Sequence, residues 1–307
     1  MIRPFESADA AGVAALFRRI APEWVVSDRG LLHWVENEPE RARLACWVAL
    51  ADGEVAGWAQ ARVRWEFASG AAEVFVGVDS PYRRHGLGGR LYELAESHLS
   101  TAARIYAEAA ADEDARRFLL LRGFSEGRSE RISVLDPQSV DLSLLSRLEA
   151  VKGGEGFRVL PLAGVTDRAA ELHRLFEAVD ADAPHSEPLV PITLEEWRAQ
   201  ILEQPDLDHE ASAVILAADG RLVAISWLQV DREGARAMVE MTGTLREFRR
   251  RGLARLAKLA TVRWAAEHGI TAMYTGNDIE NRAMLALNDE LGFEPRIVHQ
   301  DFVKELR

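Results

Sequence analysis

The chain repeats itself once over nearly its whole length, and this duplication limits the folds open to it. A loop of the pattern Arg-x-x-Gly-x-Gly/Ala occurs at residues 83–88 and again at 249–254. Two dipeptides recur with it: Asp52-Gly53 as Asp219-Gly220, and Gly123-Phe124 as Gly292-Phe293. The three offsets are 166, 167 and 169 residues. Solenoid repeats have periods of about 20–50 residues, so this spacing predicts two tandem domains.

The length of the chain agrees with two domains. At 307 residues it fits two units of roughly 150 residues each. We expect an N-terminal domain over residues 1–135 and a C-terminal domain over 157–307. Between them, residues 136–156 are expected to form a helix followed by a glycine-rich linker, Lys-Gly-Gly-Glu-Gly.

Both halves show the same order of local patterns. Apolar runs typical of strands and segments with helical spacing alternate, and one hairpin precedes each glycine loop. In the second half the expected elements are strand 157–160, helix 167–179, hairpin 213–230, strand 236–244, helix 252–267, strand 271–275 and helix 279–291. This order predicts the α/β or α+β class, with a mixed sheet covered by helices.

Each glycine loop follows an expected strand and opens an expected helix. The first backbone N–H groups of a helix have no partner within the helix, and the helix dipole favours negative charge there. Glycine lets the backbone approach a phosphate without a Cβ in the way. The two loops therefore predict two anion sites, one in each domain.

Composition excludes several classes of protein. The net charge of −12 disfavours nucleic-acid binding, which needs a basic face, and would attract a cationic amine. Cys46 is the only cysteine, so we expect neither an intrachain disulfide nor a cysteine metal cluster. We find no signal-peptide pattern and no apolar run near the ~18 residues of a membrane helix. These features predict a cytoplasmic protein.

With these motifs in view, each half resembles a GNAT-type N-acetyltransferase domain. Residues 76–88 fit the acetyl-CoA motif of that superfamily position for position, and residues 242–254 fit it with Thr244 in place of the usual valine. The later family motif, which ends in Gly-Phe, is partly kept around Asn281 and Gly292-Phe293. The resemblance covers nearly all of both halves.

The resemblance implies a mostly antiparallel twisted sheet in each domain and acetyl-CoA, or another acyl-CoA, as cofactor. It also implies direct transfer to an amine, most simply a primary amine of a small molecule, with no metal ion. The implied cofactor residues are Val76, Val78, Arg83, Arg84, His85, Gly86, Leu87, Gly88 and Gly89 in the first half, and Thr242, Thr244, Arg249, Arg250, Arg251, Gly252, Leu253, Ala254, Asn277 and Asn281 in the second.

The chain departs from the family at the general acid. The usual tyrosine lies four residues before the glycine of Gly-Phe, where this chain has Leu119 and Asn288. Asn288 can still hydrogen-bond a ligand. Side chains alternate between the two faces of a strand, so Glu240 shares a face with Thr242 and Thr244 and is the candidate base. Glu73 stands at the other parity before its glycine loop, so its side chain is expected on the opposite face. We therefore expect catalysis in the second half, with Glu240 and Asn288.

Other residues of the first half have simpler interpretations. We expect Glu108 and Asp112 to be structural, and Trp24 and Trp34 lie where the family builds its acceptor pocket. Two further functions stay open, a non-catalytic acyl-CoA-binding module and a protein or peptide N-acetyltransferase. The oligomeric state is expected to be a monomer or a homodimer.

Overall fold

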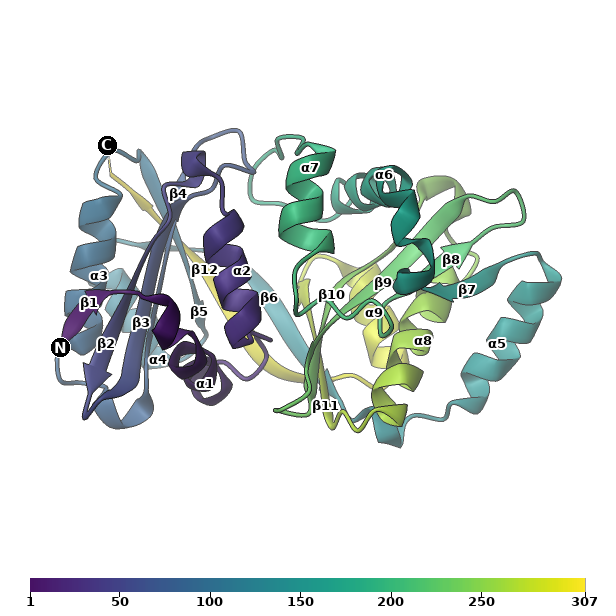
Figure 1. Ribbon diagram of the computed structural model, residues 1–307, viewed down its shortest axis with the longest axis horizontal. Helices are drawn as coiled ribbons and strands as arrows, with labels where there is room; N and C mark the ends of the chain where they lie inside the picture. The colour runs from purple at the N-terminus through teal and green to yellow at the C-terminus, as the bar shows by residue number, and fades with distance from the viewer. Residues whose placement is uncertain (307) are drawn as a thin grey trace. The chain divides into compact units, whose positions relative to one another are not determined.

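The computed structural model of the protein describes residues 1–306. They form two compact units, each built from more than one stretch of the chain. Unit 1 contains Met1–Glu130, His185–Pro191 and the C-terminal segment from Ile297, and unit 2 contains Arg131–Pro184 and Ile192–Arg296. Each unit is a mixed, mostly antiparallel sheet with helices on its faces, as the sequence predicts (Figure 1).

Unit 1 begins with the N-terminal elements in the expected order. They are β1 (Ile2–Pro4), α1 (Ala10–Ile20), α2 (Asp28–Asn37), β2 (Ala45–Ala51), β3 (Glu54–Val63), β4 (Ala72–Val78), α3 (Leu87–His98), β5 (Arg104–Ala110) and α4 (Glu113–Leu120). The strand order is β1-β2-β3-β4-β5, and β12 (Glu294–Glu305) follows at the far edge of β5. Among the pairs β1–β2, β2–β3, β3–β4, β4–β5 and β5–β12 within residues 1–306, the pair β4–β5 is parallel and the others are antiparallel.

Two hydrophobic layers hold the helices of unit 1 on its sheet. On one face Leu16 and Phe17 of α1 pack with Trp58 of β3, whose side chain is fully buried. On the other face Leu91 of α3 packs against Ala59 of β3. Burial at about 25 cal/mol per Å² of apolar surface is what fixes each amphipathic helix to its face.

Unit 2 repeats this plan. Its elements are α5 (Ser143–Gly154), β7 (Arg158–Pro161), α6 (Ala169–Asp180), α7 (Leu194–Trp197), β8 (Ala213–Leu216), β9 (Leu222–Asp231), β10 (Arg236–Thr244), α8 (Leu253–Glu267), β11 (Ala272–Asp278) and α9 (Arg282–Glu290). The strand order is β7-β8-β9-β10-β11, with β6 (Ser125–Leu135) beside β11. Here β10 pairs with β11 in parallel, whereas β7–β8, β8–β9 and β9–β10 are antiparallel.

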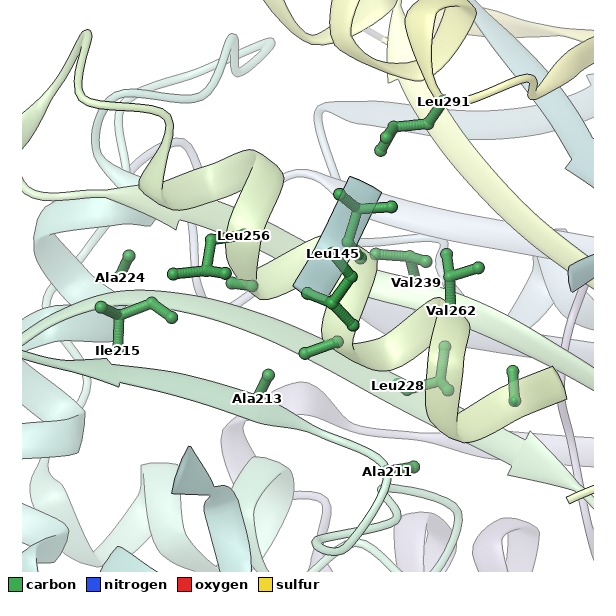
Figure 2. Packing of buried hydrophobic residues seen from close by; sticks show 14 of the residues in the cluster. Leu145, Ala211, Ala213, Ile215, Ala224, Leu228, Val239, Leu256, Val262 and Leu291 are labelled. Atoms are coloured by element: carbon green, nitrogen blue, oxygen red, sulfur yellow. The ribbon is translucent and has the colours of Figure 1, made fainter. Parts of the chain in front are cut away.

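Helix α8 is the centre of the unit 2 core. Leu256 and Val262 of this helix pack over the sheet residues Ile215, Leu228 and Val239, as Figure 2 shows. Leu145 of α5 enters the same cluster and is 1% exposed.

The position of α5 differs from the linker expected at 136–156. Helix α5 runs to Gly154, so Gly153 and Gly154 of the presumed linker form its last turn. Glu149 also forms an ion pair with Arg263 of α8 at 3.2 Å. The buried Leu145 ties this segment to unit 2, and burial overrides the flexibility that the glycines suggest.

Strands β6 and β12 are not confined to the halves in which their sequences lie. The compact units place Ser125–Glu130 in unit 1 and the rest of β6 in unit 2, while β12 passes into unit 1 from Ile297 onward. The expected contiguous halves, 1–135 and 157–307, therefore differ from the observed units. The physical reason is β5, whose edge away from β4 is paired antiparallel with His299–Glu305. A long unpaired edge there would leave its backbone groups without partners.

We predict that the C-terminal strand is needed for the stability of unit 1. Phe302 of β12 is 1% exposed and packs in the cluster that contains Tyr92 of α3 and Ile105 of β5. Phe302→Ala should lower the free energy of unfolding by about 3–5 kcal/mol, since it removes a buried aromatic ring. Val298→Ala, on the same strand at a side chain that is 42% exposed, is the matched control and should change it by less than about 0.5 kcal/mol. Urea denaturation followed by circular dichroism measures both, and equal effects of the two substitutions would contradict the prediction.

Candidate active site

The candidate site of unit 1 lies where two parallel strands part. Strands β4 and β5 pair only from Ala72 to Val74 and from Ile105 to Ala107. Beyond this short ladder β4 continues to Val78 and β5 continues to Ala110 along β12. Past Val74 and Ala107 the two strands are no longer paired, and a space lined by residues of both lies between them.

A cavity of about 490 Å³ occupies this space. Its wall on one side is the final part of β4 from Phe75 to Val78, and on the other the end of β5 from Glu108 to Ala110. Its lining also includes Gly88 and Gly89 at the start of α3, and Trp24 and His299. The cavity thus joins the predicted anion site to a cluster of charged and aromatic side chains.

The two glycine loops have the same backbone shape. Gly86 and Gly252 take the left-handed conformation, with φ of +77° and +74°. Arg84 and Arg250 do the same at φ of 66° and 61°, which is uncommon for residues with a Cβ. A strained conformation repeated at equivalent positions indicates a functional loop, and it turns successive N–H groups toward one side.

The arginines of the loops are partly engaged by the protein itself. Nε of Arg83 donates to the carbonyl of Val78 at 2.9 Å, and Nε of Arg249 donates to the carbonyl of Thr244 at 3.2 Å. Arg84 pairs with Asp114, and Arg249 also pairs with Asp182. Arg83 and Arg84 still line the cavity. Arg83 and Arg249 therefore hold their loops on the ends of β4 and β10, whereas Arg84 ties its loop to α4.

The remaining loop residues divide into packed and exposed groups. Leu87 packs against the sheet beside Val76 and Val78, and Leu253 is 1% exposed in the unit 2 core. His85 is exposed and is not among the residues that line the cavity. The guanidinium of Arg251 lies 5.6 Å from the ring of Phe248, and Ala254 is half-buried.

A cluster of two carboxylates and one imidazole lines the cavity. Nε2 of His299 is 2.8 Å from Oε1 of Glu23, and Nδ1 of His299 is hydrogen-bonded to Glu108. Burial alone would lower the pKa of the imidazole, but the hydrogen bonds to Glu108 and Glu23 outweigh it and raise the pKa to about 10. His299 is therefore an imidazolium at neutral pH.

Sequence reasoning missed this cluster. It treated Glu108 as structural, and nothing indicated that a histidine 191 residues further along the chain would contact it. The position of Glu108 directly after the short parallel ladder is a signal that could have identified the carboxylate. Trp24, expected near an acceptor pocket, does line the cavity, and Asp112 caps α4 by accepting from the N–H of Ala115 at 2.7 Å.

Unit 2 shows the same divergence of strands. The parallel ladder of β10 with β11 ends at Val239 and Thr275. A β-bulge lies between Val239 and Met241 in the pairing of β10 with β9, so Glu240 is the extra residue. Glu240 remains accessible to water, while desolvation by the surrounding protein raises the pKa of its carboxyl.

Because of the bulge, the alternation of side chains along β10 does not fix the face on which Glu240 lies. Val239 belongs to the cluster around Leu256 and Val262 of α8. Met241, two positions along the strand, packs on a different cluster, which contains Leu172 and Phe176 of α6. The strict period of two is therefore broken at Glu240, and the parity count from Thr242 and Thr244 does not extend to it. Glu73 is engaged elsewhere, accepting from Nε of Arg62 at 2.7 Å.

The threonines of β10 are directed into the protein. Oγ1 of Thr242 is 3.1 Å from Oγ of Ser226 on β9. Thr244 is 8% exposed, and its hydroxyl has no hydrogen-bond partner among residues 1–306. Asn281 is the N-cap of α9, where its side chain accepts from the N–H of Met284 at 3.3 Å.

A buried lysine supports the asparagine at the position of the family tyrosine. Nζ of Lys258 on α8 donates to Oδ1 of Asn288 and, at 3.0 Å, to Oγ1 of Thr275. Asn288 in turn donates to Oδ1 of Asn277 at 2.6 Å, so two of the predicted residues are brought together. Lys258 is fully buried, and desolvation lowers its pKa to about 7. In unit 1 the corresponding Leu119 is a core residue, 7% exposed.

Two kinds of feature are absent from the part of the chain that the structure describes. Among residues 1–306 no group of three or more His, Cys, Asp or Glu side chains could hold a metal ion. Within the same range, no helix combines the length and the apolar character that crossing a membrane requires.

Comparisons with known proteins agree with this architecture. The family model described as "Acetyltransferase (GNAT) family" matches residues 13–124 and 171–293. A mycothiol acetyltransferase from Kytococcus sedentarius is 28% identical over 235 residues, which are 74% of this chain and 73% of that protein.

Solved structures share the fold over the whole chain. A GCN5-related N-acetyltransferase from Sphaerobacter thermophilus aligns with a TM-score of 0.68 at 19% identity, covering 100% of this chain and 96% of that one. A tandem GNAT protein from the clavulanic acid biosynthesis pathway aligns with a TM-score of 0.67 at 19% identity, covering 99% and 98%. At this identity the structures establish the fold alone.

We predict that Lys258 makes stability depend on pH. Its pKa is about 7 in the folded protein and near 10.5 when unfolded, so the unfolded chain binds more protons between these values. The contribution of Lys258 therefore rises from pH 7 to pH 10, by at most about 1.4 kcal/mol per pH unit. Lys258→Met removes this term.

Urea denaturation of wild type and Lys258→Met at pH 7 and pH 9.5 measures it. We expect the wild type to gain stability relative to the variant as pH rises. A difference between the two proteins that stays constant over this range would contradict the assignment.

Proposed function

The chain belongs to the acetyltransferase (GNAT) family, and on this premise we propose that it transfers the acetyl group of acetyl-CoA to the primary amine of a small molecule. The observation that carries the proposal is the cavity of unit 1, which runs from a glycine loop at a helix N-terminus to a carboxylate at the end of β5. The relative from Kytococcus sedentarius bears the name of an acetyltransferase for a small molecule, which supports the same substrate class.

The residues that line the cavity fit acetyl-CoA. Gly88 and Gly89 present backbone without side chains at the start of α3, where a pyrophosphate would meet free N–H groups. Beyond Val74, β4 no longer pairs with β5, so its backbone can bind the amides of the pantetheine arm. When bound, acetyl-CoA supplies an activated thioester carbonyl. The work of this chain is to align an amine with that carbonyl and to receive a proton.

We propose an equivalent site in unit 2. Its loop repeats the backbone conformation at Arg250 and Gly252, and its strands part in the same way after Val239. Glu240 is the candidate base there, because it lies on the bulge at the point of divergence. Asn288, held by Lys258, is the candidate hydrogen-bond donor near the leaving group.

We predict that each glycine loop controls one cofactor site. Gly86→Val and Gly252→Val place a β-branched residue in the left-handed conformation, with a cost of order 1–3 kcal/mol that should distort the loop. Each variant should lose at least about 10-fold in acetyl-CoA affinity at its own site, measured by calorimetric titration.

Matched controls exist in the hairpin turns of the two units. Gly53 and Gly220 have φ of +87° and +84° with open space around them, so Gly53→Val and Gly220→Val add comparable strain away from the loops. The controls should keep wild-type affinity. A wild-type protein that binds neither acetyl-CoA nor other acyl-CoAs would reject the proposed function. Tight binding with no amine-dependent release of coenzyme A would favour a non-catalytic binding module.

We predict that Glu240 contributes to turnover in unit 2. Glu240→Gln removes the base without a change of size and should lower kcat by about 100-fold or more at that site. Glu73→Gln is the control, since Glu73 of β4 is engaged with Arg62. Coenzyme A release in a Gly86→Val background measures both variants. Full activity of Glu240→Gln would remove Glu240 from the mechanism.

A further inference from the structure

We propose that Glu23, Glu108 and His299 form the acceptor site of unit 1, which binds a cationic primary amine and removes its proton at Glu108. The inference rests on the proposed function, because it names the substrate class of the same cavity. It also gives unit 1 a catalytic residue, where the sequence favoured unit 2 alone.

Three separate elements bring these side chains together. Glu23 follows the end of α1, Glu108 lies on β5 one residue past the parallel ladder, and His299 lies on β12. His299 is paired with Ala110 across the β5–β12 ladder, so it reaches Glu108 diagonally on the same face of the sheet. All three line the cavity.

The charges in the cluster leave it negative. Both ring nitrogens of His299 contact a carboxylate, so both donate and the ring is an imidazolium. Two carboxylates and one imidazolium give a net charge of about −1. Oε2 of Glu23 is buried and has no hydrogen-bond partner among residues 1–306. Such an oxygen contributes nothing to an ion pair within the protein. A ligand ammonium would compensate the net negative charge of the cluster.

The exposure of the three side chains assigns their roles. The side chains of Glu23 and His299 are 3% and 4% exposed, whereas that of Glu108 is 35% exposed. Glu108 is therefore the group that an acceptor can touch, which makes it the catalytic residue. Glu23 and His299 are positioning residues, since Glu23 holds the ring and the ring holds Glu108.

An aromatic wall stands beside the cluster. The rings of Trp24 and Phe75 are 5.0 Å apart, and the ring of Trp24 is 6.1 Å from that of His299. Aromatic faces attract an ammonium group and also bury the carbon body of a ligand. The acceptor that fits is a compact cation with an apolar body.

The proton balance of the transfer is complete with these groups. The ammonium of the acceptor gives one proton to Glu108 and becomes a neutral amine. The amine nitrogen forms a bond to the thioester carbonyl carbon, and the carbon–sulfur bond breaks. The nitrogen then loses a second proton, which the thiolate of coenzyme A takes up to give the free thiol. The proton on Glu108 passes to water.

The test uses the full chain carrying Gly252→Val, so that the unit 2 loop does not contribute. The probes are benzylamine, tyramine, cadaverine and glucosamine, with benzyl alcohol as the neutral counterpart of benzylamine. Three quantities are measured: acetyl-CoA affinity by calorimetry, coenzyme A release, and the ring ¹⁵N shifts of His299 on addition of each probe. Glu54→Gln, at an exposed carboxylate of the β2–β3 hairpin outside the cavity lining, is the matched control.

We expect at least one amine, and not the alcohol, to accelerate release and to shift the His299 signals. Glu108→Gln should lose about 100-fold or more in kcat/KM with acetyl-CoA affinity unchanged within about 3-fold. His299→Gln and Glu23→Gln should raise KM for the amine and move the pH profile of kcat, which a purely structural change would not do.

Three outcomes would overturn the inference while leaving the proposed function intact. In the first, acetyl-CoA binds but no amine of the panel changes release or the His299 signals. In the second, an amine is acetylated and Glu108→Gln is as active as Glu54→Gln. Failure of the wild-type protein to bind acetyl-CoA would instead reject the proposed function itself, whereas binding by the wild type and none by the Gly252→Val chain would overturn the inference alone.

Discussion

The short parallel ladder is the constraint on which the sites of this protein depend. In unit 1 it joins β4 to β5 over Ala72–Val74, and in unit 2 it joins β10 to β11 over Arg236–Val239. The β3–β4 and β9–β10 pairs beside these ladders are antiparallel and longer. Because the parallel pairing stops in mid-strand, backbone of β4 and of β10 is left for a ligand. The glycine loop follows directly at the end of the same strand, so one divergence places unpaired strand backbone next to the loop.

The far edge of β5 explains why the end of the chain belongs to unit 1. Strand β5 parts from β4, so its other edge has to supply the pairing that holds it in place. Residues His299–Glu305 of β12 do this and bring His299 to Glu108. A strand that stabilises the fold therefore also completes the charged end of the cavity.

Each unit buries a basic side chain, His299 in unit 1 and Lys258 in unit 2, and the surroundings of the two differ. In unit 1 the imidazolium of His299 is matched by two carboxylates, so burial leaves it charged. In unit 2 the hydrogen bonds that the buried Lys258 ammonium donates within residues 1–306 go to the neutral oxygens of Thr275 and Asn288, and burial lowers its pKa to about 7. The tyrosine position of the family is thus replaced by two unlike arrangements, a core leucine and a lysine-supported asparagine.

Local sequence was sufficient to predict the duplication, the order of the elements and the two glycine loops. Glycines in strained turns, apolar periodicity and a constant offset are properties of neighbouring residues, and they predicted β10 and α8 almost to the residue. Only the tertiary structure decided where β6 and β12 pair, that 152–154 are helical, and that a bulge interrupts parity at Glu240. It alone brought Glu23, Glu108 and His299 together across 276 residues of chain. These outcomes depend on which edges need partners and which charges are buried, and both are set by contacts between residues far apart in sequence.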